Sequence, residues 1–405
     1  MKLLFYIEPV VFRDDPSFLK PWVDWIARIA RANVGLVDVG LCSNRNLCVR
    51  FRDSVGAGAA TTFPVDLVDV LRPFGFSRTR YGRALYAEES RHWLELTAAL
   101  EEISEKFSPD VVISFTSAPA LRRAFRNCVL LFTEVGPLSR LNGQKTFFFD
   151  PGGQHADSIL NTRWSEIVDS PCPVTASTAM QLIDRYASMN SSHEAAAPVR
   201  DWLTGIARRE EISIVALQPT DWPSFEGLAP DEDPISLVLS DASAHPGLRI
   251  VPTYHIDQRF DPEMEQFIEA EAPNVSFPPR HLSSGLTELF LPYVHRVCTV
   301  SSTTALPAIL LGCEVQLRGR SSFWAAAQAS NSARVDSTEH AQLVAKLLAF
   351  LSNRYLQLQH EVLDTPGALP SYVSCLMNGR DPLDAMLNFA DWNLSKAERV
   401  LGLSL

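Results

Sequence analysis

Short runs of apolar residues alternate with helix-like segments along this chain, and the alternation constrains the fold more than any other feature. Val111–Phe115 and Cys128–Phe132 are short and, apart from Ser114, apolar, as strands buried on both faces of a parallel sheet usually are. Phe18–Ala32 instead places its apolar residues on one side of a helix. Strands that alternate with helices predict βαβ units and parallel sheets. The expected fold class is therefore α/β.

The same pattern occurs a second time, after a polar stretch at 190–197 that we expect to be a loop. The simplest architecture is two open α/β halves that meet at a cleft, followed by a mainly helical carboxyl-terminal stretch. We expect a first domain over 1–205, a second over 206–382 and a terminal helical segment over 383–405. Four runs in the second half are predicted to be strands: Ile212–Leu217, Ile235–Leu239, Leu248–Val251 and Val297–Val300.

Composition limits the functions that such a chain performs. Its 405 residues suffice for two domains, and 46% hydrophobic with 20% charged residues is typical of a globular protein. The formal charge of −11 argues against a nucleic-acid partner. Seven cysteines without a Cys-x-x-Cys pair indicate reduced thiols of a cytoplasmic protein. No stretch supplies the ~18 apolar residues of a membrane span, so membrane contact is expected to be at most peripheral.

Polar residues follow the predicted strands in both halves. Ligands of open α/β sheets bind outside the carboxyl ends of the strands, so these residues are the candidates for a binding site. In the first half they include Ser117, Glu134, Gly136 and Asp150; in the second they include Gln218, Asp221, His255 and the hydroxyl cluster at Ser301, Ser302, Thr303 and Thr304.

The hydroxyl cluster is the most informative of these groups. An apolar run ends at Ser301, four hydroxyl residues follow, and a helix-like segment then runs from Ala305 to Leu311 before Gly312. Free backbone N–H groups at the start of a helix, beside hydroxyl donors, form an anion site that suits a phosphate. An ordinary helix N-cap explains the same residues equally well.

Each of the other candidates also has a purely structural explanation. Asp150 precedes Pro-Gly-Gly, and an Asx-turn accounts for it best. Glu134 and Asp221 are placed to cap a helix or a turn, and a single histidine such as His255 is more often structural than catalytic. No glycine-rich dinucleotide or phosphate-loop motif is present.

Four short motifs, in order across roughly residues 110–325, resemble those of bacterial glycosyltransferases that use CMP-sugars. The Val300–Gly312 segment is similar to their Ser-Ser/Thr motif, and Thr133–Gly136 to their acidic-x-Gly motif. Leu217–Asp221 resembles the Gln-x-x-Asp strand end of the retaining β-Kdo transferases of O-antigen and capsule synthesis. Tyr254-His255 stands where those enzymes carry His-Pro, although Ile256 replaces the proline here.

This resemblance implies a GT-B fold, in which two Rossmann-like domains face a central cleft. The second domain would hold the CMP-sugar donor, the first would hold a saccharide or lipid-linked oligosaccharide acceptor, and the terminal helix would cross back to the first domain. Enzymes of this kind generally need no metal ion, and CMP-Kdo is their donor substrate. The resemblance therefore implies neither a cofactor nor a metal ion. The protein would work in the cytoplasm, with the inner face of the inner membrane as a candidate place of action.

The resemblance also assigns roles to residues. Asp221 would be the nucleophile of a double displacement, Glu134 the base for the acceptor hydroxyl, and His255 the group that assists the leaving phosphate. Arg318 or Arg320 would bind the carboxylate of the sugar through a bidentate pair. Gln218, Ser117, Gly136 and the four hydroxyl residues would bind substrate.

Three alternative functions remain open on the sequence. The first is an inverting CMP-sugar transferase similar to sialyltransferases, with Glu134 as the base and Asp221 only binding substrate. The second is a non-catalytic nucleotide-sugar-binding protein, and the third is a two-domain UDP-sugar epimerase. The acceptor, the linkage and the oligomeric state are not specified by any motif.

Overall fold

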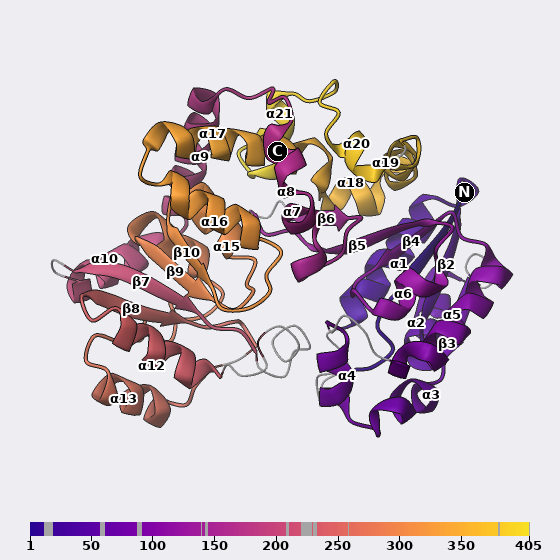
Figure 1. Ribbon diagram of the computed structural model, residues 1–405, viewed down its shortest axis with the longest axis horizontal. Coiled ribbons are helices and arrows are strands. Elements are labelled where there is room, and N and C mark those ends of the chain that lie inside the picture. Colours follow the sequence, from indigo (N-terminus) through magenta and orange to yellow (C-terminus); the bar gives the residue numbers. More distant parts are fainter. Residues whose placement is uncertain are drawn as a thin grey trace.

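The computed structural model describes residues 1–11, 19–56, 61–86, 91–138, 140–141, 145–207, 210–219, 229, 233–257, 259–379 and 381–404. Within these ranges the chain forms two β-sheets, each covered by helices on both faces (Figure 1). The predicted α/β class is confirmed, and two Rossmann-like halves lie side by side as the GT-B architecture requires.

Seven strands of the described residues form the first sheet, in the order β11-β6-β5-β4-β1-β2-β3. The five strands from β5 to β3 are parallel, whereas β6 is antiparallel to both β5 and β11. The strands are β1 (Lys2–Tyr6), β2 (Asp38–Asn44), β3 (Thr61–Val65), β4 (Val111–Ser114), β5 (Val129–Val135), β6 (Thr146–Asp150) and β11 (Leu356–Leu358).

The described residues of the second half form a parallel sheet of four strands in the order β10-β9-β7-β8. Its central strands are buried because helices cover both faces, which is why most of their residues are apolar. In Figure 1 the carboxyl ends of β7 and β8 point toward the first half. The strands are β7 (Glu211–Ala216), β8 (Leu248–Thr253), β9 (Arg296–Thr299) and β10 (Glu314–Leu317).

Helices connect these strands. Those of the first half are α1 (Lys20–Ala32), α2 (Arg45–Val55), α3 (Leu67–Leu71), η2 (Arg72–Phe74), α4 (Arg78–Ala84), η3 (Arg91–Trp93), α5 (Leu94–Phe107), α6 (Pro119–Ala124), η4 (His155–Asp157), α7 (Ile159–Thr162) and α8 (Trp164–Asp169). Those of the second half are α9 (Ala176–Ser191), α10 (Ala196–Ala207), α12 (Pro234–Ala244), α13 (Pro262–Glu271), α14 (Thr287–Phe290), η5 (Leu291–Tyr293), α15 (Ala305–Leu310), α16 (Trp324–Ala333) and α17 (Ser337–Phe350). The chain then continues through η6 (Leu351–Tyr355), α18 (Gln359–Asp364), α19 (Ala368–Met377), α20 (Pro382–Met386) and α21 (Leu394–Val400).

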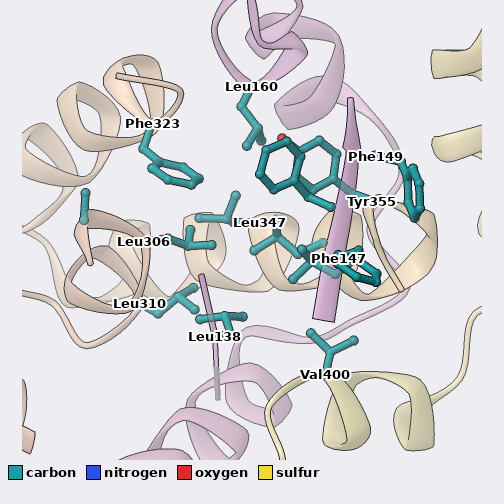
Figure 2. Close-up of a cluster of buried hydrophobic side chains, with 14 of the residues drawn as sticks. Leu138, Phe147, Phe149, Leu160, Leu306, Leu310, Phe323, Leu347, Tyr355 and Val400 are labelled. Atoms are coloured by element: carbon teal, nitrogen blue, oxygen red, sulfur yellow. The ribbon is translucent and has the colours of Figure 1, made fainter. Parts of the chain in front are cut away.

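One apolar core is shared by the two halves, and Figure 2 shows part of it. Phe147 of β6 lies in the same cluster as Leu306 of α15, Leu347 of α17 and Val400 of α21. A second cluster lies on the other face of the first sheet, and a third lies on the other face of the second sheet. Since apolar burial is the main stabilising term in folding, the shared core joins the halves far more firmly than a linker alone would.

The chain passes between the halves at other points than the expected domain boundaries. Helix α9 packs on α17 and α10 packs on α14, so residues from 176 onward already accompany the second sheet. The return begins before residue 383, because β11 pairs with β6 in the first sheet. The terminal helix α21 then contacts β11 and η6. The chain passes from the first half to the second near residue 170 and returns near residue 351. The domain boundaries at 205 and 382 stay a prediction.

One predicted strand is wrong. Ile235–Leu239 lies in α12, whose first turn is capped by Asp233 and carries Pro234 at its start. Proline at the first helical position and an Asp N-cap are strong helix-start signals, and they outweigh a five-residue apolar run that fits either structure.

A buried ion pair holds α12 on the second sheet. The Arg296 guanidinium of β9 donates to both carboxylate oxygens of Asp241 at 2.7 and 2.8 Å. The two side chains are only 3% and 4% exposed, and Ser213 of β7 accepts a further hydrogen bond from Arg296 at 2.8 Å. Asp241 therefore fixes the face of α12 that meets the sheet.

Among the helices of the described residues, none is both long enough and apolar enough to cross a membrane.

Candidate functional site

The Gln218 side chain joins the carboxyl ends of β7 and β9. Its Oε1 accepts from the backbone N–H of Ser301 at 2.8 Å and from the Thr299 hydroxyl at 3.3 Å. Its Nε2 donates to the Ser301 hydroxyl at 3.3 Å. We call these three contacts the Gln218 bridge. The bridge fixes where the hydroxyl cluster begins, so the structure brings together two motifs that lie about eighty residues apart.

The hydroxyl cluster forms the predicted connection between strand and helix. β9 ends at Thr299, α15 begins at Ala305, and Gly312 follows with a φ of 77° before β10. Ser301 is buried, whereas Ser302, Thr303 and Thr304 are half-buried. The Ser302 hydroxyl accepts from the Thr304 N–H at 3.2 Å, and Thr304 itself caps no backbone group through its side chain. Ser302 therefore orders the turn that leads into α15.

His255 lies just beyond β8, on the same edge of the second sheet. Its Nδ1 is 3.3 Å from the backbone N of Asp257 and 3.2 Å from the Asp257 carboxylate. A neutral ring thus accepts from the backbone N–H, and a protonated ring pairs with the carboxylate. His255 and Gln218 line one small pocket together with Leu217 and Tyr254. The predicted proximity of these two strand ends is therefore present in the structure.

Arg318 and Arg320 both carry exposed side chains after β10. The Arg318 backbone N–H donates to the Thr299 carbonyl at 2.8 Å, which places this loop beside the hydroxyl cluster. Arg320 reaches the first half, where its guanidinium donates to the Tyr86 carbonyl at 3.2 Å. The two arginines thus differ in surroundings: one lies at the second sheet and the other contacts both halves.

A second contact between the halves lies next to Tyr86. The backbone N–H of His155 donates to the Ser322 hydroxyl at 2.8 Å, and its ring meets the Tyr86 ring edge-on at 5.1 Å. Burial lowers the pKa of His155 to about 4, so its imidazole is neutral at pH 7. Asn161 adds two hydrogen bonds, to the Ser321 carbonyl at 2.7 Å and from the Ala325 N–H at 3.0 Å.

Glu134 lies within β5 and not after it, because the strand continues to Val135. It faces Phe148 of β6 in the antiparallel register. Burial raises the pKa of Glu134, while the charge of Arg140 acts in the opposite direction. The Tyr86 pKa is raised mainly by burial and further by the charges of Glu134 and Glu8. The charge of Glu134 thus acts on Tyr86, whose backbone carbonyl contacts the second half.

Gly136 and Ser117 have clear packing roles. A Cβ on Gly136 would lie 1.9 Å from the Thr146 hydroxyl, and the Gly136 N–H donates to the Thr146 carbonyl at 2.7 Å. Only glycine allows β5 and β6 to approach this closely. The buried Ser117 hydroxyl accepts from the Gln154 N–H at 2.7 Å. Both residues shape the strand ends of the first sheet.

The Asx-turn predicted at Asp150 is confirmed. Its Oδ1 accepts from the N–H groups of Gly152 and Gly153 at 2.8 and 3.1 Å. Its Oδ2 accepts from Ser158 at 2.6 Å and from the Tyr355 hydroxyl at 2.9 Å. Asp150 thus orders the loop that carries His155 and attaches it to the carboxyl-terminal region.

Sequence reasoning missed Glu8, which follows β1. The carboxyl group is 3% exposed; it accepts a hydrogen bond from Tyr81, and it lies 3.4 Å from the hydroxyls of both Tyr6 and Thr116. Burial raises the pKa of Glu8 to about 7. The sheet order places it where the chain changes direction between β1 and β4, the usual ligand position in such sheets. A carboxylate directly after the first strand was its only sequence signal.

Asp221, the predicted nucleophile, lies outside the described residues. The described chain resumes at residue 233, at the N-cap of α12. In the described ranges, no three His, Cys, Asp or Glu side chains are grouped so as to hold a metal ion. A hollow of about 470 Å³ lies elsewhere, between β3, α3 and α5, and is lined by residues such as Phe63, Leu96 and Lys106.

No family model and no curated protein matches this chain. Among solved structures it is similar to the β-Kdo 2,7 transferase of KpsC from Thermosulfurimonas dismutans, at 12% identity and a TM-score of 0.40, over 89% of this chain and 97% of that one. It is also similar to a UDP-GlcNAc 2-epimerase from Neisseria meningitidis, at 12% identity and a TM-score of 0.33, over 94% and 100% of the two chains. The calicheamicin glycosyltransferase CalG4 has 13% identity and a TM-score of 0.31, over 95% and 96%. These values assign neither an activity nor a substrate to this chain.

Proposed function

We propose that this protein is a nucleotide-sugar glycosyltransferase of the GT-B type that transfers Kdo from CMP-β-Kdo to a saccharide acceptor with retention of configuration. The biological setting would be O-antigen or capsule synthesis. The Gln218 bridge is the observation that carries the proposal, because it holds the hydroxyl cluster at the carboxyl edge of a parallel sheet. His255 and Gln218 border one small pocket at this edge.

The donor would bind at this edge through its phosphate. Ser302, Thr303 and Thr304 are half-buried, and their hydroxyl groups would bind the phosphate. The backbone of Arg318 lies beside them, and we expect its guanidinium group to pair with the sugar carboxylate. The net charge of −11 does not oppose this, since the donors act locally. No metal ion is needed in this scheme, and EDTA should leave transfer unchanged.

Two displacements at the anomeric carbon would give retention. The Asp221 carboxylate forms a bond to that carbon as the bond to the CMP phosphate breaks, and protonated His255 donates a hydrogen bond or its proton to the leaving phosphate. Glu134 then takes the proton of the acceptor hydroxyl, whose oxygen replaces Asp221. Burial raises the pKa of Glu134, which is the direction that strengthens a carboxylate as a base.

A panel of nucleotides tests the donor class first. CMP, UDP, GDP and ADP are each added to the protein, and CMP alone should raise the unfolding midpoint, because a ligand that binds only the folded state stabilises it. Ser302→Ala should weaken CMP binding by about tenfold, for one charge-assisted hydrogen bond lost. Unchanged CMP affinity in alanine variants of all four hydroxyl residues would contradict the site.

Product analysis then tests the reaction. NMR of the product from CMP-Kdo should show the retained configuration, and Asp221→Asn should bind CMP yet transfer almost nothing. Glu134→Gln should retain CMP binding and lose transfer. An inverted product would favour the inverting alternative, CMP binding without turnover a binding protein, and conversion of UDP-GlcNAc an epimerase.

A further inference from the structure

A strained turn at Phe76 carries an aromatic ring into solvent. Phe76 has a φ of 58° and is 60% exposed, and its N–H donates to the Leu71 carbonyl at 2.9 Å. A bulky side chain in the left-handed region costs energy that glycine or asparagine would avoid. An exposed ring recovers none of that cost through burial in the core. Folding stability therefore does not explain phenylalanine at this position.

Further apolar side chains are exposed on the helical run that leads to this turn. Val68 and Leu67 of α3 are 51% and 38% exposed. Val70 and Phe74 of the same run are buried in the first half, so the run already meets the core with its other face. Val68 and Arg72 are one helical turn apart and share the outward face, and the turn at Phe76 follows directly.

Exposed arginines surround the turn. Arg72, Arg80 and Arg83 all have exposed side chains. An Arg80 guanidinium nitrogen lies 3.5 Å from the point where Gly75 would carry a Cβ, so its charge is beside the turn. Arg80 and Arg83 are three residues apart on α4 and therefore neighbours. Arg72 pairs with Asp69 at 2.9 Å, but both side chains are more than half exposed, and such pairs contribute little.

We propose that this surface, formed by Leu67, Val68, Arg72, Phe76 and Arg80 and here named the Phe76 surface, docks on an anionic phospholipid bilayer. In a chain with a net charge of −11, a local group of arginines beside exposed apolar side chains is complementary to phosphate headgroups above hydrocarbon. The ring enters the interfacial region, while the guanidinium groups pair with lipid phosphates. Contact of this size is reversible. In Figure 1, α3 and α4 lie together at the lower end of the first half.

Flotation with lipid vesicles tests the inference without any sugar substrate. The full chain is mixed with vesicles of phosphatidylcholine alone or with phosphatidylglycerol added. Binding should require phosphatidylglycerol and should weaken as salt is raised, since the Debye length shortens. Phe76→Ala should reduce the partition coefficient by about tenfold, the scale for one aromatic side chain transferred from water. Arg80→Gln combined with Arg83→Gln should reduce binding and its salt dependence.

Phe267 provides a matched control, because it is also an exposed phenylalanine, at 52%, on α13 of the second half. Phe267→Ala should bind vesicles as the parent does. Unfolding midpoints of all variants establish that the fold is retained. The inference is overturned if the parent floats with neither vesicle, or if the two phenylalanine variants lose binding equally. Because the assay contains no nucleotide, its failure leaves the proposed transferase activity untouched, and a failed CMP titration leaves the lipid result intact.

Discussion

Two substitutions of Gln218 separate the two roles that the Gln218 bridge would have: it would stabilise the second half, and it would hold the hydroxyl cluster in place for CMP. Gln218→Ala removes the acceptor of the Ser301 N–H, a group in a residue that is 6% exposed. A buried donor left without a partner costs about 1–3 kcal/mol, so the free energy of unfolding of the second half should fall by that amount. CMP affinity should fall as well, because the hydroxyl cluster is no longer held in place.

Gln218→Glu should weaken CMP binding while it leaves the stability of the fold almost unchanged. The carboxylate still accepts from the Ser301 N–H and the Thr299 hydroxyl, and the Ser301 hydroxyl can turn to donate to it. Unfolding free energy should therefore stay within about 1 kcal/mol of the parent, in line with a hydrogen bond kept to a charged acceptor. Its negative charge, however, would lie near the proposed phosphate. Two like charges within about 8 Å at an effective dielectric constant near 20 repel by about 2 kcal/mol, or roughly 30-fold in the dissociation constant.

Urea unfolding and CMP titration calorimetry measure these two quantities in the same samples. Gln328→Glu is the matched control, since it adds the same charge on an exposed position of α16 and should alter neither. If Gln218→Glu binds CMP as tightly as the parent, no phosphate lies beside the bridge and the site is wrong. If Gln218→Ala costs no stability, the three hydrogen bonds do not order the cluster.

Other predictions concern His255, Glu8 and the buried ion pair. His255→Ala should lower turnover by roughly 10²-fold at unchanged CMP affinity, as expected for a lost general acid; steady-state kinetics near the parent rate would make His255 structural. Asp241→Ala should cost about 3–5 kcal/mol in urea unfolding, since it leaves the Arg296 charge buried, whereas Asp69→Ala, at the exposed pair with Arg72, should cost less than about 1 kcal/mol. Burial raises the pKa of Glu8 from 4.5 to about 7, so the folded protein holds a proton there that the unfolded chain releases. This contribution to stability is complete below pH 4.5 and is lost as the pH rises through 7. Glu8→Gln mimics the protonated carboxyl, and its stability relative to the parent should rise by about 3 kcal/mol across that window; parallel pH profiles would refute the shift.

The parts of the fold that the sequence predicts are those with one physical explanation. β4 and β9 are short, their central residues are apolar, and both strands are buried in parallel sheets. The connection after β9 was predictable because hydroxyl residues and Gly312 mark the two ends of α15. The run in α12 was ambiguous by length, and only its Asp-Pro start distinguishes helix from strand.

Pairing over long sequence distances was not predictable. The antiparallel strands β6 and β11 lie about two hundred residues apart, and β11 has only three residues. No local pattern specifies that partner. The burial of Glu8 was not predictable for the same reason, because its environment depends on Tyr81, seventy-three residues away. Site residues can be predicted where they directly follow a strand. They cannot be predicted where a helix distant in the sequence determines how deeply the side chain is buried.

The late position of β11 has a consequence for synthesis of the protein on the ribosome. Leu356 pairs with Phe148, so the edge of the first sheet stays uncovered until residue 356 has emerged, after about seven-eighths of the chain. The second sheet needs no residue beyond β10, which ends at Leu317, and its strands can pair earlier. The nascent chain would therefore expose the β6 edge, with its three consecutive phenylalanines, while later helices are still being made. Unpaired apolar strand edges favour aggregation. A ribosome pause before residue 356 would prolong this exposed stage, and a chaperone would protect the chain most during it.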